Sequence, residues 1–123
     1  MNNVLFLGRR NDIARLMSAA DVLVSASASE GFSLAITEAC ASGLRVLASD
    51  IPHHRRMHDL FPKQVALFRY SGVESIARGL DMQRWNGNCC LIQPSLRSLA
   101  LVSGKRMSQQ YQELYDTSFK EPQ

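Results

Sequence analysis

The sequence predicts an α/β fold, in which helices cover both faces of a parallel sheet. Short apolar runs alternate with segments of helical periodicity along most of the chain, as in strand-helix-strand units with right-handed crossovers. The runs are apolar at consecutive positions, which is typical of strands that are buried on both faces. We expect one domain over residues 1–123, because a chain of this length fits a single hydrophobic core.

The first strand-helix-strand unit is expected near the amino terminus. Val4–Gly8 is a short apolar run closed by glycine, and it is interpreted as a buried strand. Asp12–Ala20 has apolar residues at helical spacing, with Asn11 or Asp12 as the cap. Val22–Val24 is predicted to be the second strand.

The alternation continues through the middle of the chain. A helix is predicted over Phe32–Ser42, and Gly43 would end it in a left-handed conformation. The strand Val46–Ala48 follows, and Pro52 can begin the next helix, which is expected to run to about Leu60. The remaining elements are expected to be a strand at Val65–Phe68, a helix at Val73–Met82, an irregular segment at 84–94 and a helical segment at 95–117.

The composition limits the classes of partner. With 14 Lys and Arg against 11 Asp and Glu, the net charge of +3 suits ligands that carry phosphate, or an anionic membrane surface, without indicating nucleic acid. The three cysteines include no C-x-x-C pair, which favours a reducing, cytoplasmic setting. No apolar run reaches about 18 residues, so we expect at most a peripheral contact at the inner face of a membrane.

The stretch Ser29–Ala39 is where a ligand site is expected. Ligands of open parallel sheets bind outside the carboxyl ends of the strands, and Val22–Val24 leads directly into this stretch. The start of the following helix offers free backbone N–H groups and a positive dipole end, which together suit a phosphate. The amides concerned are those of Gly31, Phe32, Ser33 and Leu34.

Two carboxylates flank these amides. Carboxylates repel phosphate but pair well with hydroxyl groups, so Glu30 is expected to face a sugar. Glu38, further along the helix, could reach a second set of hydroxyls such as a ribose diol. Two polyols that are bridged by a diphosphate describe a nucleotide-sugar.

These residues also carry a family resemblance. E-G-F-S-L-A-I-T-E resembles the E-x7-E motif of retaining GT-B glycosyltransferases, especially family 4. The similarity extends to F-L-G…D-I-A-R-L-M-S-A-A-D-V-L-V-S-A-S before the motif, to E-A-C-A-S-G-L-R-V-L-A-S-D-I-P-x-H-R after it, and to Val65–Phe68. It covers roughly residues 3 to 80. The resemblance implies a Rossmann-like sheet and part of the C-terminal, donor-binding domain of such an enzyme.

The resemblance also implies roles for individual residues. Glu30 would contact the transferred sugar and is the candidate catalytic residue, while the amides of Gly31–Leu34 would hold sugar hydroxyls and the distal phosphate. Glu38 would bind the nucleotide ribose. The sugar would be transferred with retention, and protein groups rather than a metal or other cofactor would stabilise the departing diphosphate.

The chain also departs from the family pattern. In relatives an arginine and a lysine that clamp the donor phosphates precede the segment that corresponds to Val4–Gly8, and we expect that this chain lacks them as well as the acceptor-binding domain. We therefore expect the nucleotide-sugar-binding part of an enzyme of cell-surface glycan or glycolipid synthesis, inactive until an acceptor-binding domain or partner chain joins it. The alternative is a non-catalytic remnant or interaction module. Exposed sheet edges or apolar patches would favour self-association.

Plainer structural interpretations of the same residues stay open. Glu30 could form a capping box with Ser27, and Glu38 could be a solvated helix residue. His54 and His58 lie four apart and could bind a metal, but with no third ligand in view they are expected to be surface or partly buried side chains.

Overall fold

The computed structural model describes residues 3–69 and 73–81, together with 100, 103–106, 108–109 and 113. Within these residues, three strands form a parallel sheet in the order β1-β2-β3. Leu47 at the centre of the sheet is paired with Val24 on one side and Ala66 on the other. The strands are β1 (Val22–Ser25), β2 (Arg45–Ser49) and β3 (Val65–Phe68).

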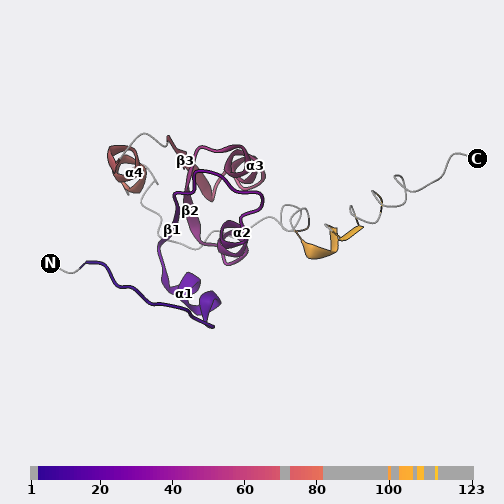
Figure 1. Cartoon of the computed structure of the whole chain (residues 1–123), viewed down its shortest axis with the longest axis horizontal. Helices are drawn as coiled ribbons and strands as arrows, with labels where there is room; N and C mark the ends of the chain where they lie inside the picture. The colour runs from indigo at the N-terminus through magenta and orange to yellow at the C-terminus, as the bar shows by residue number, and fades with distance from the viewer. Residues whose placement is uncertain are drawn as a thin grey trace, which may run out of the picture.

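Helices lie on both faces of this sheet (Figure 1). Successive side chains of a strand point to opposite faces, so Val46 and Ala48 pack on one face while Leu47 points to the other. Val46 and Ala48 belong to a buried cluster with residues of three helices, whereas Leu47 lies against Gly79 of the fourth. The helices are α1 (Ile13–Ala19), α2 (Leu34–Ala41), α3 (Pro52–Leu60) and α4 (Val73–Leu80).

The core lies between the sheet and helices α2 and α3. Ile36, Val46 and Met57 are among the largest side chains that are fully buried. The sheet and its helices on both faces confirm the predicted α/β, Rossmann-like fold class. The buried cluster on the α2 and α3 side consists of Met17, Ile36, Ala39, Cys40, Leu44, Val46, Ala48, Met57, Phe61 and Val65.

Local sequence rules account for the helix ends. Pro52 occupies the first position of α3, where its missing N–H breaks no helical bond. Gly43 has a φ of 74°, so the predicted left-handed glycine after α2 is confirmed. Asp12 does occupy the N-cap position of α1, but its carboxylate binds Arg10 instead of a helix amide.

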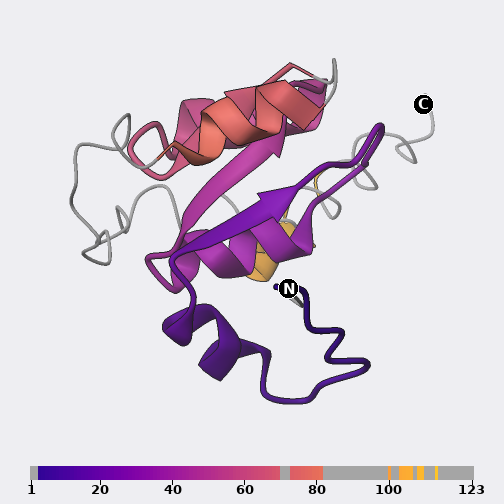
Figure 2. The same ribbon diagram turned by 90° about the vertical axis from the view of Figure 1, so that its left-hand side faces the viewer.

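The prediction of a buried strand at Val4–Gly8 is wrong. The segment forms no strand in the described chain, and Phe6 is 92% exposed while Leu5 is 80% exposed. Figure 2 shows it running beside α1 and away from the sheet. A short apolar run becomes a strand only where a neighbouring strand accepts its backbone hydrogen bonds, and within the described chain β1 is paired on one edge only, with β2.

The carboxyl-terminal predictions are covered only in part. The irregular segment at 84–94 lies outside the described residues, as does most of the helical segment at 95–117. The described positions in the second segment include a few in helical conformation, among them 104–106. Among the helices that the structure describes, none has the length and apolar character needed to cross a membrane.

Candidate functional site

The candidate site lies at the carboxyl ends of β1 and β2. The loop that follows β1 and the turn that follows β2 are joined there, because the Ser49 hydroxyl donates a hydrogen bond to the Ser27 carbonyl at 2.5 Å. The backbone N–H of Asp50 donates to the Phe68 carbonyl at 2.8 Å, which ties the same turn to β3. The three strand ends therefore hold the loops that carry the candidate residues.

Each carboxylate oxygen of Glu30 has a neighbouring polar group. The Ser27 hydroxyl donates to Oε1, and Oε2 lies 3.4 Å from Nε2 of His54. The side chain is 23% exposed, so part of it faces solvent. The hydrogen bond from Ser27 is the main cause that lowers the pKa of Glu30 below its usual value, and burial opposes this shift. Glu30 is thus a fixed, ionised acceptor at the edge of the sheet.

His54 connects Glu30 to the end of β2. Its side chain is completely buried, and Nδ1 lies 2.9 Å from the Ser49 carbonyl oxygen and 3.2 Å from the Ser49 hydroxyl. A carbonyl oxygen only accepts hydrogen bonds, so Nδ1 must carry the hydrogen. Nε2 then points at Glu30, and the two form an ion pair whenever the ring carries both protons.

The amino end of α2 lies next to this carboxylate in the chain. Ser33 is the N-cap, and its hydroxyl accepts a long hydrogen bond from the N–H of Ile36 at 3.5 Å. The N–H of Ser33 itself donates to Nε2 of His53 at 3.1 Å. Within the described chain the N–H groups of Leu34 and Ala35 have no acceptor, so they are available to an anion.

His53 lies over this helix end beside an aromatic ring. Its ring centroid is 5.5 Å from that of Phe32 and 6.4 Å from that of His54. The side chain is half-buried. Burial is the main cause that lowers the pKa of His53, the charges of His54 and Arg56 lower it further, and Glu30 opposes them.

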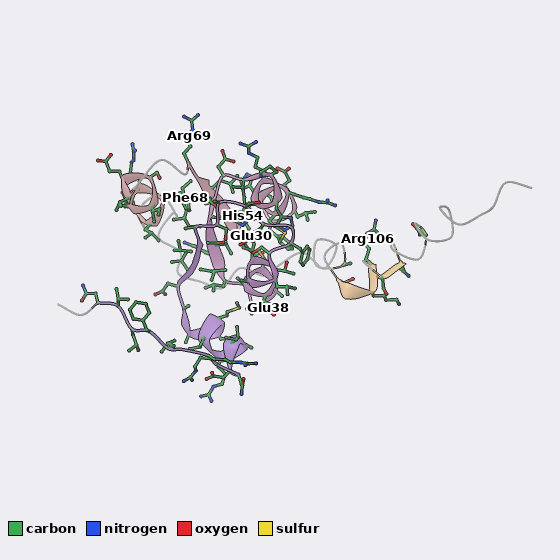
Figure 3. The ribbon with its side chains drawn as sticks, viewed as in Figure 1. Glu30, Glu38, His54, Phe68, Arg69 and Arg106 are labelled. Carbon is green, nitrogen blue, oxygen red and sulfur yellow. The ribbon has the colours of Figure 1, made fainter. Side chains whose placement is uncertain are left out.

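The residues predicted from the sequence occupy two places. Glu30 and the four residues that follow it lie in the loop after β1 and at the start of α2, where Ser33 is buried, Phe32 is 42% exposed and Leu34 is 65% exposed. Glu38 is exposed one helical turn beyond Leu34, on the same side of α2. Figure 3 shows Glu30 beside His54, with Glu38 apart from them on α2. Within the described residues the Glu38 carboxylate has no hydrogen-bond partner.

Sequence reasoning missed the contributions of His53, His54 and Ser49. It considered His54 only with His58, as surface or partly buried residues, yet His54 is fully buried and its Nε2 lies 3.4 Å from the Glu30 carboxylate. One signal was available: residues that directly follow a parallel strand gather at the same sheet edge as those that follow its neighbour. The interaction of Ser27 with Glu30 is present, although as a bond between side chains, while Ser33 caps the helix.

Other basic groups near the turn have structural partners. Arg55 forms an ion pair with Asp50 at 2.5 Å, and Nδ1 of His58 lies 2.6 Å from the Val65 carbonyl. In the part of the chain that the structure describes, no three His, Cys, Asp or Glu side chains are placed to hold a metal ion.

A cavity of about 860 Å³ lies elsewhere, between the sheet and α4. Its lining includes Arg45, Lys63, Arg69 and Arg78 and none of the predicted site residues. The candidate site is therefore not part of this cavity and lies at the carboxyl ends of the strands.

Comparison with known proteins gives one match. A family model described as "Glycosyl transferases group 1" matches residues 1–80, which include the whole sheet and every candidate site residue. No curated protein and no solved structure matches the chain. The match supports a role in glycosyl transfer, and the parallel sheet with its covering helices is consistent with it. The chain belongs to the glycosyl transferases group 1 family.

Proposed function

We propose that this chain is the nucleotide-sugar-binding part of a retaining GT-B glycosyltransferase of family 4, and that the complete enzyme acts in the synthesis of cell-surface glycans or glycolipids. One observation carries the proposal. The Glu30 carboxylate accepts a hydrogen bond from Ser27 and faces His54, directly before a helix whose first amides can donate hydrogen bonds to an anion. A group that can accept hydrogen bonds from sugar hydroxyls therefore lies next to groups that can donate hydrogen bonds to a phosphate.

Glu30 is proposed to bind the transferred sugar. Its pKa is lowered, chiefly by the Ser27 hydroxyl, so the group is a carboxylate near neutral pH and accepts hydrogen bonds from sugar hydroxyls. Because Ser27 donates to one of its oxygens and His54 lies beside the other, the carboxylate has a set direction. Such fixed acceptors favour one orientation of a bound sugar, as positioned groups do in catalytic sites.

The diphosphate and the ribose are assigned to α2. The N–H groups of Gly31–Leu34 are proposed to hold sugar hydroxyls and the distal phosphate, since the helix dipole favours negative charge there. Glu38 lies five residues after the N-cap Ser33, about 7.5 Å along the helix axis. Helical side chains lean toward the amino end, so the Glu38 carboxylate can reach back toward a ribose that follows the phosphates.

The proposal includes a second protein part. The described site offers groups to the donor only, so turnover is proposed to require an acceptor-binding domain or partner chain, at a cytoplasmic site that touches the inner face of a membrane. No metal or other cofactor is required by the proposed contacts, because the helix amides and nearby side chains would stabilise the departing diphosphate.

Calorimetric titration with a panel of nucleotides tests the proposal. The ligands are the diphosphates of uridine, guanosine and adenosine and their glucose and mannose conjugates. Glu38→Ala and Glu38→Gln are expected to weaken binding about tenfold or more, because a hydrogen bond to a charged group is lost. The control is Glu74→Gln, which removes an exposed carboxylate from the first turn of α4, on the other face of the sheet.

The outcomes separate the two candidate functions. Saturable binding that the Glu38 variants weaken and the Glu74 variant preserves supports the donor-binding proposal and names the base. Equal binding by the wild type and the Glu38 variants contradicts the role of Glu38. Silence across the panel contradicts the whole proposal and favours a non-catalytic remnant or interaction module.

A further inference from the structure

His53 occupies the amide that a bound anion would use. The N–H of Ser33 donates to Nε2 of His53 at 3.1 Å. The accepting nitrogen of an imidazole carries no proton, so this hydrogen bond requires a neutral ring with its hydrogen on Nδ1. In the protein without ligand, the ring therefore occupies the N–H of Ser33. The N–H groups of Leu34 and Ala35 have no acceptor among the described residues.

We propose that His53 gates the anion position of the donor site. In the free protein the neutral ring caps the Ser33 amide. When a diphosphate arrives, the ring turns off the amide, takes one proton from solvent, and donates a hydrogen bond to a phosphate oxygen as an imidazolium. This inference rests on the proposed function and deepens it, because it assigns diphosphate recognition to a residue outside the E-x7-E stretch.

The charges around His53 set the direction of the coupling. His54 and Arg56 on α3 lower its pKa, in addition to the larger effect of burial, and Glu30 on the β1 loop raises it. The ring is therefore neutral near neutral pH in the free protein. A diphosphate at the helix end adds negative charge on the side of Glu30, which raises the pKa of the ring. Binding is thus coupled to proton uptake, and affinity increases as the pH falls from about 8 toward 6.

The surroundings of the ring permit this movement. The side chain is half-buried and lies at the start of α3, and its aromatic neighbour Phe32 is 42% exposed. His53 is not a member of the buried cluster beneath the sheet. Rotation about its side-chain bonds therefore exchanges one hydrogen bond for another and leaves the core packing unchanged.

Charge compensation gives a reason for the gate. An anion at the amino end of α2 lies close to the Glu30 carboxylate, whose repulsion the helix dipole offsets only in part. Arg55 is already paired with Asp50. Among the described residues, His53 is the basic side chain in hydrogen-bond contact with this helix end, so its protonation supplies positive charge where the ligand adds negative charge.

Sulfate is a suitable first probe, because it remains a dianion across the tested range and contributes no titration of its own. Nuclear magnetic resonance would follow the amides of Ser33, Leu34 and Ala35 during sulfate titrations at about pH 8 and about pH 6. The wild type is expected to bind about tenfold more tightly at the lower pH, which is within the limit of about a hundredfold that one linked proton sets over two pH units. Calorimetry in buffers of different ionisation enthalpy should show proton uptake.

Two substitutions separate the cap from the charge. His53→Ala removes both, so the affinity of this variant for sulfate should not change with pH. At the higher pH its affinity should exceed that of the wild type about fivefold, because no capping hydrogen bond competes with the anion. At the lower pH its affinity should fall below that of the wild type. His53→Gln keeps an acceptor for the Ser33 amide but cannot be protonated, so its binding should be weaker and independent of pH. His58→Gln, which alters a histidine bonded to the Val65 carbonyl, is the control and should keep the wild-type profile.

Each result decides something. Parallel pH profiles for the wild type and His53→Ala, or no sulfate effect on the Ser33 amide at either pH, overturn the gate. The nucleotide panel is run separately on the same proteins. If the sulfate affinities of the wild type and His53→Ala cross between the two pH values but no nucleotide binds, the gate is supported and the donor-binding function is rejected. If nucleotides bind but the two pH profiles are parallel, the donor-binding function is supported and the gate is rejected.

Discussion

Glu30 and His54 meet at the carboxyl edge of the sheet although 24 residues separate them in the chain, with Oε2 of the carboxylate 3.4 Å from Nε2 of the ring. The ring is anchored from behind, because Nδ1 lies 2.9 Å from the Ser49 carbonyl at the end of β2. The orientation of Glu30 is therefore set by the neighbouring strand as well as by its own loop. Substitutions at the end of β2 should therefore alter the position of the Glu30 carboxylate.

His54→Leu tests the structural weight of this contact. The substitution leaves the half-buried Glu30 carboxylate without one partner and removes the donor to the Ser49 carbonyl, so we expect a loss of about 2 kcal/mol in the free energy of unfolding. Urea denaturation measures it. His54→Gln retains an amide donor and should lose less. Identical unfolding midpoints for His54→Leu and the wild type would show that the contact contributes nothing to stability.

Ser27→Ala should raise the pKa of Glu30, because the Ser27 hydroxyl is the main cause that lowers it. A carboxyl whose pKa is lowered by folding stabilises the protein above its unfolded pKa, and this contribution disappears as the pH falls through its folded pKa. The stability difference between the wild type and Ser27→Ala should thus be full near neutral pH and shrink in acid. Carboxyl ¹³C titration of Glu30 measures the shift directly, and an unchanged pKa in the variant would rule out Ser27 as its cause.

Much of the fold could be predicted because local signals agreed with tertiary packing. The helix Pro52–Leu60 and the strand Val65–Phe68 have the predicted bounds, since a proline fixes the start of the first and a fully apolar run defines the second. Val4–Gly8 has an equally apolar pattern but is exposed to solvent. Apolar character alone does not identify the strand that would accept its hydrogen bonds, so the pattern could not distinguish the two cases.

The candidate site could be predicted only along one stretch of chain. Glu30 and the helix amides follow β1 in sequence, so the strand pattern located them. The contacts of His53 with the Ser33 amide and of His54 with Glu30 span 20 and 24 residues. Which ring nitrogen meets which partner depends on how α3 leaves β2, and neither periodicity nor spacing contains that information.

Gly79 allows α4 to lie close to the sheet. A Cβ atom at this position would lie 2.7 and 2.8 Å from the two methyl carbons of Leu47, which is fully buried. Gly79→Ala would normally strengthen a helix by up to about 1 kcal/mol, but overpacking costs about 1 to 3 kcal/mol. We expect a net loss in the free energy of unfolding, measured by urea denaturation.

A second substitution provides the control for Gly79. Leu47→Val removes the methyl carbons that the new Cβ atom would meet, so Gly79→Ala should be harmless or stabilising in that background. The double-mutant cycle isolates the interaction between the two positions. Equal effects of Gly79→Ala in both backgrounds would show that the packing of α4 on Leu47 does not decide the result.

The segment Val4–Gly8 should promote self-association of the chain. Phe6 and Leu5 are 92% and 80% exposed, and within the described sheet β1 has a strand neighbour on one edge only. An open strand edge and exposed apolar residues each offer a surface to which a second copy can bind. Sedimentation velocity over a concentration series should reveal dimers or larger species, and Leu5→Ser with Phe6→Ser should shift them toward monomer. Arg9→Ser, an exposed change just beyond the apolar run, is the matched control. A wild type that stays monomeric at every concentration would contradict this prediction, because the apolar surface would then be tolerated in water without a partner.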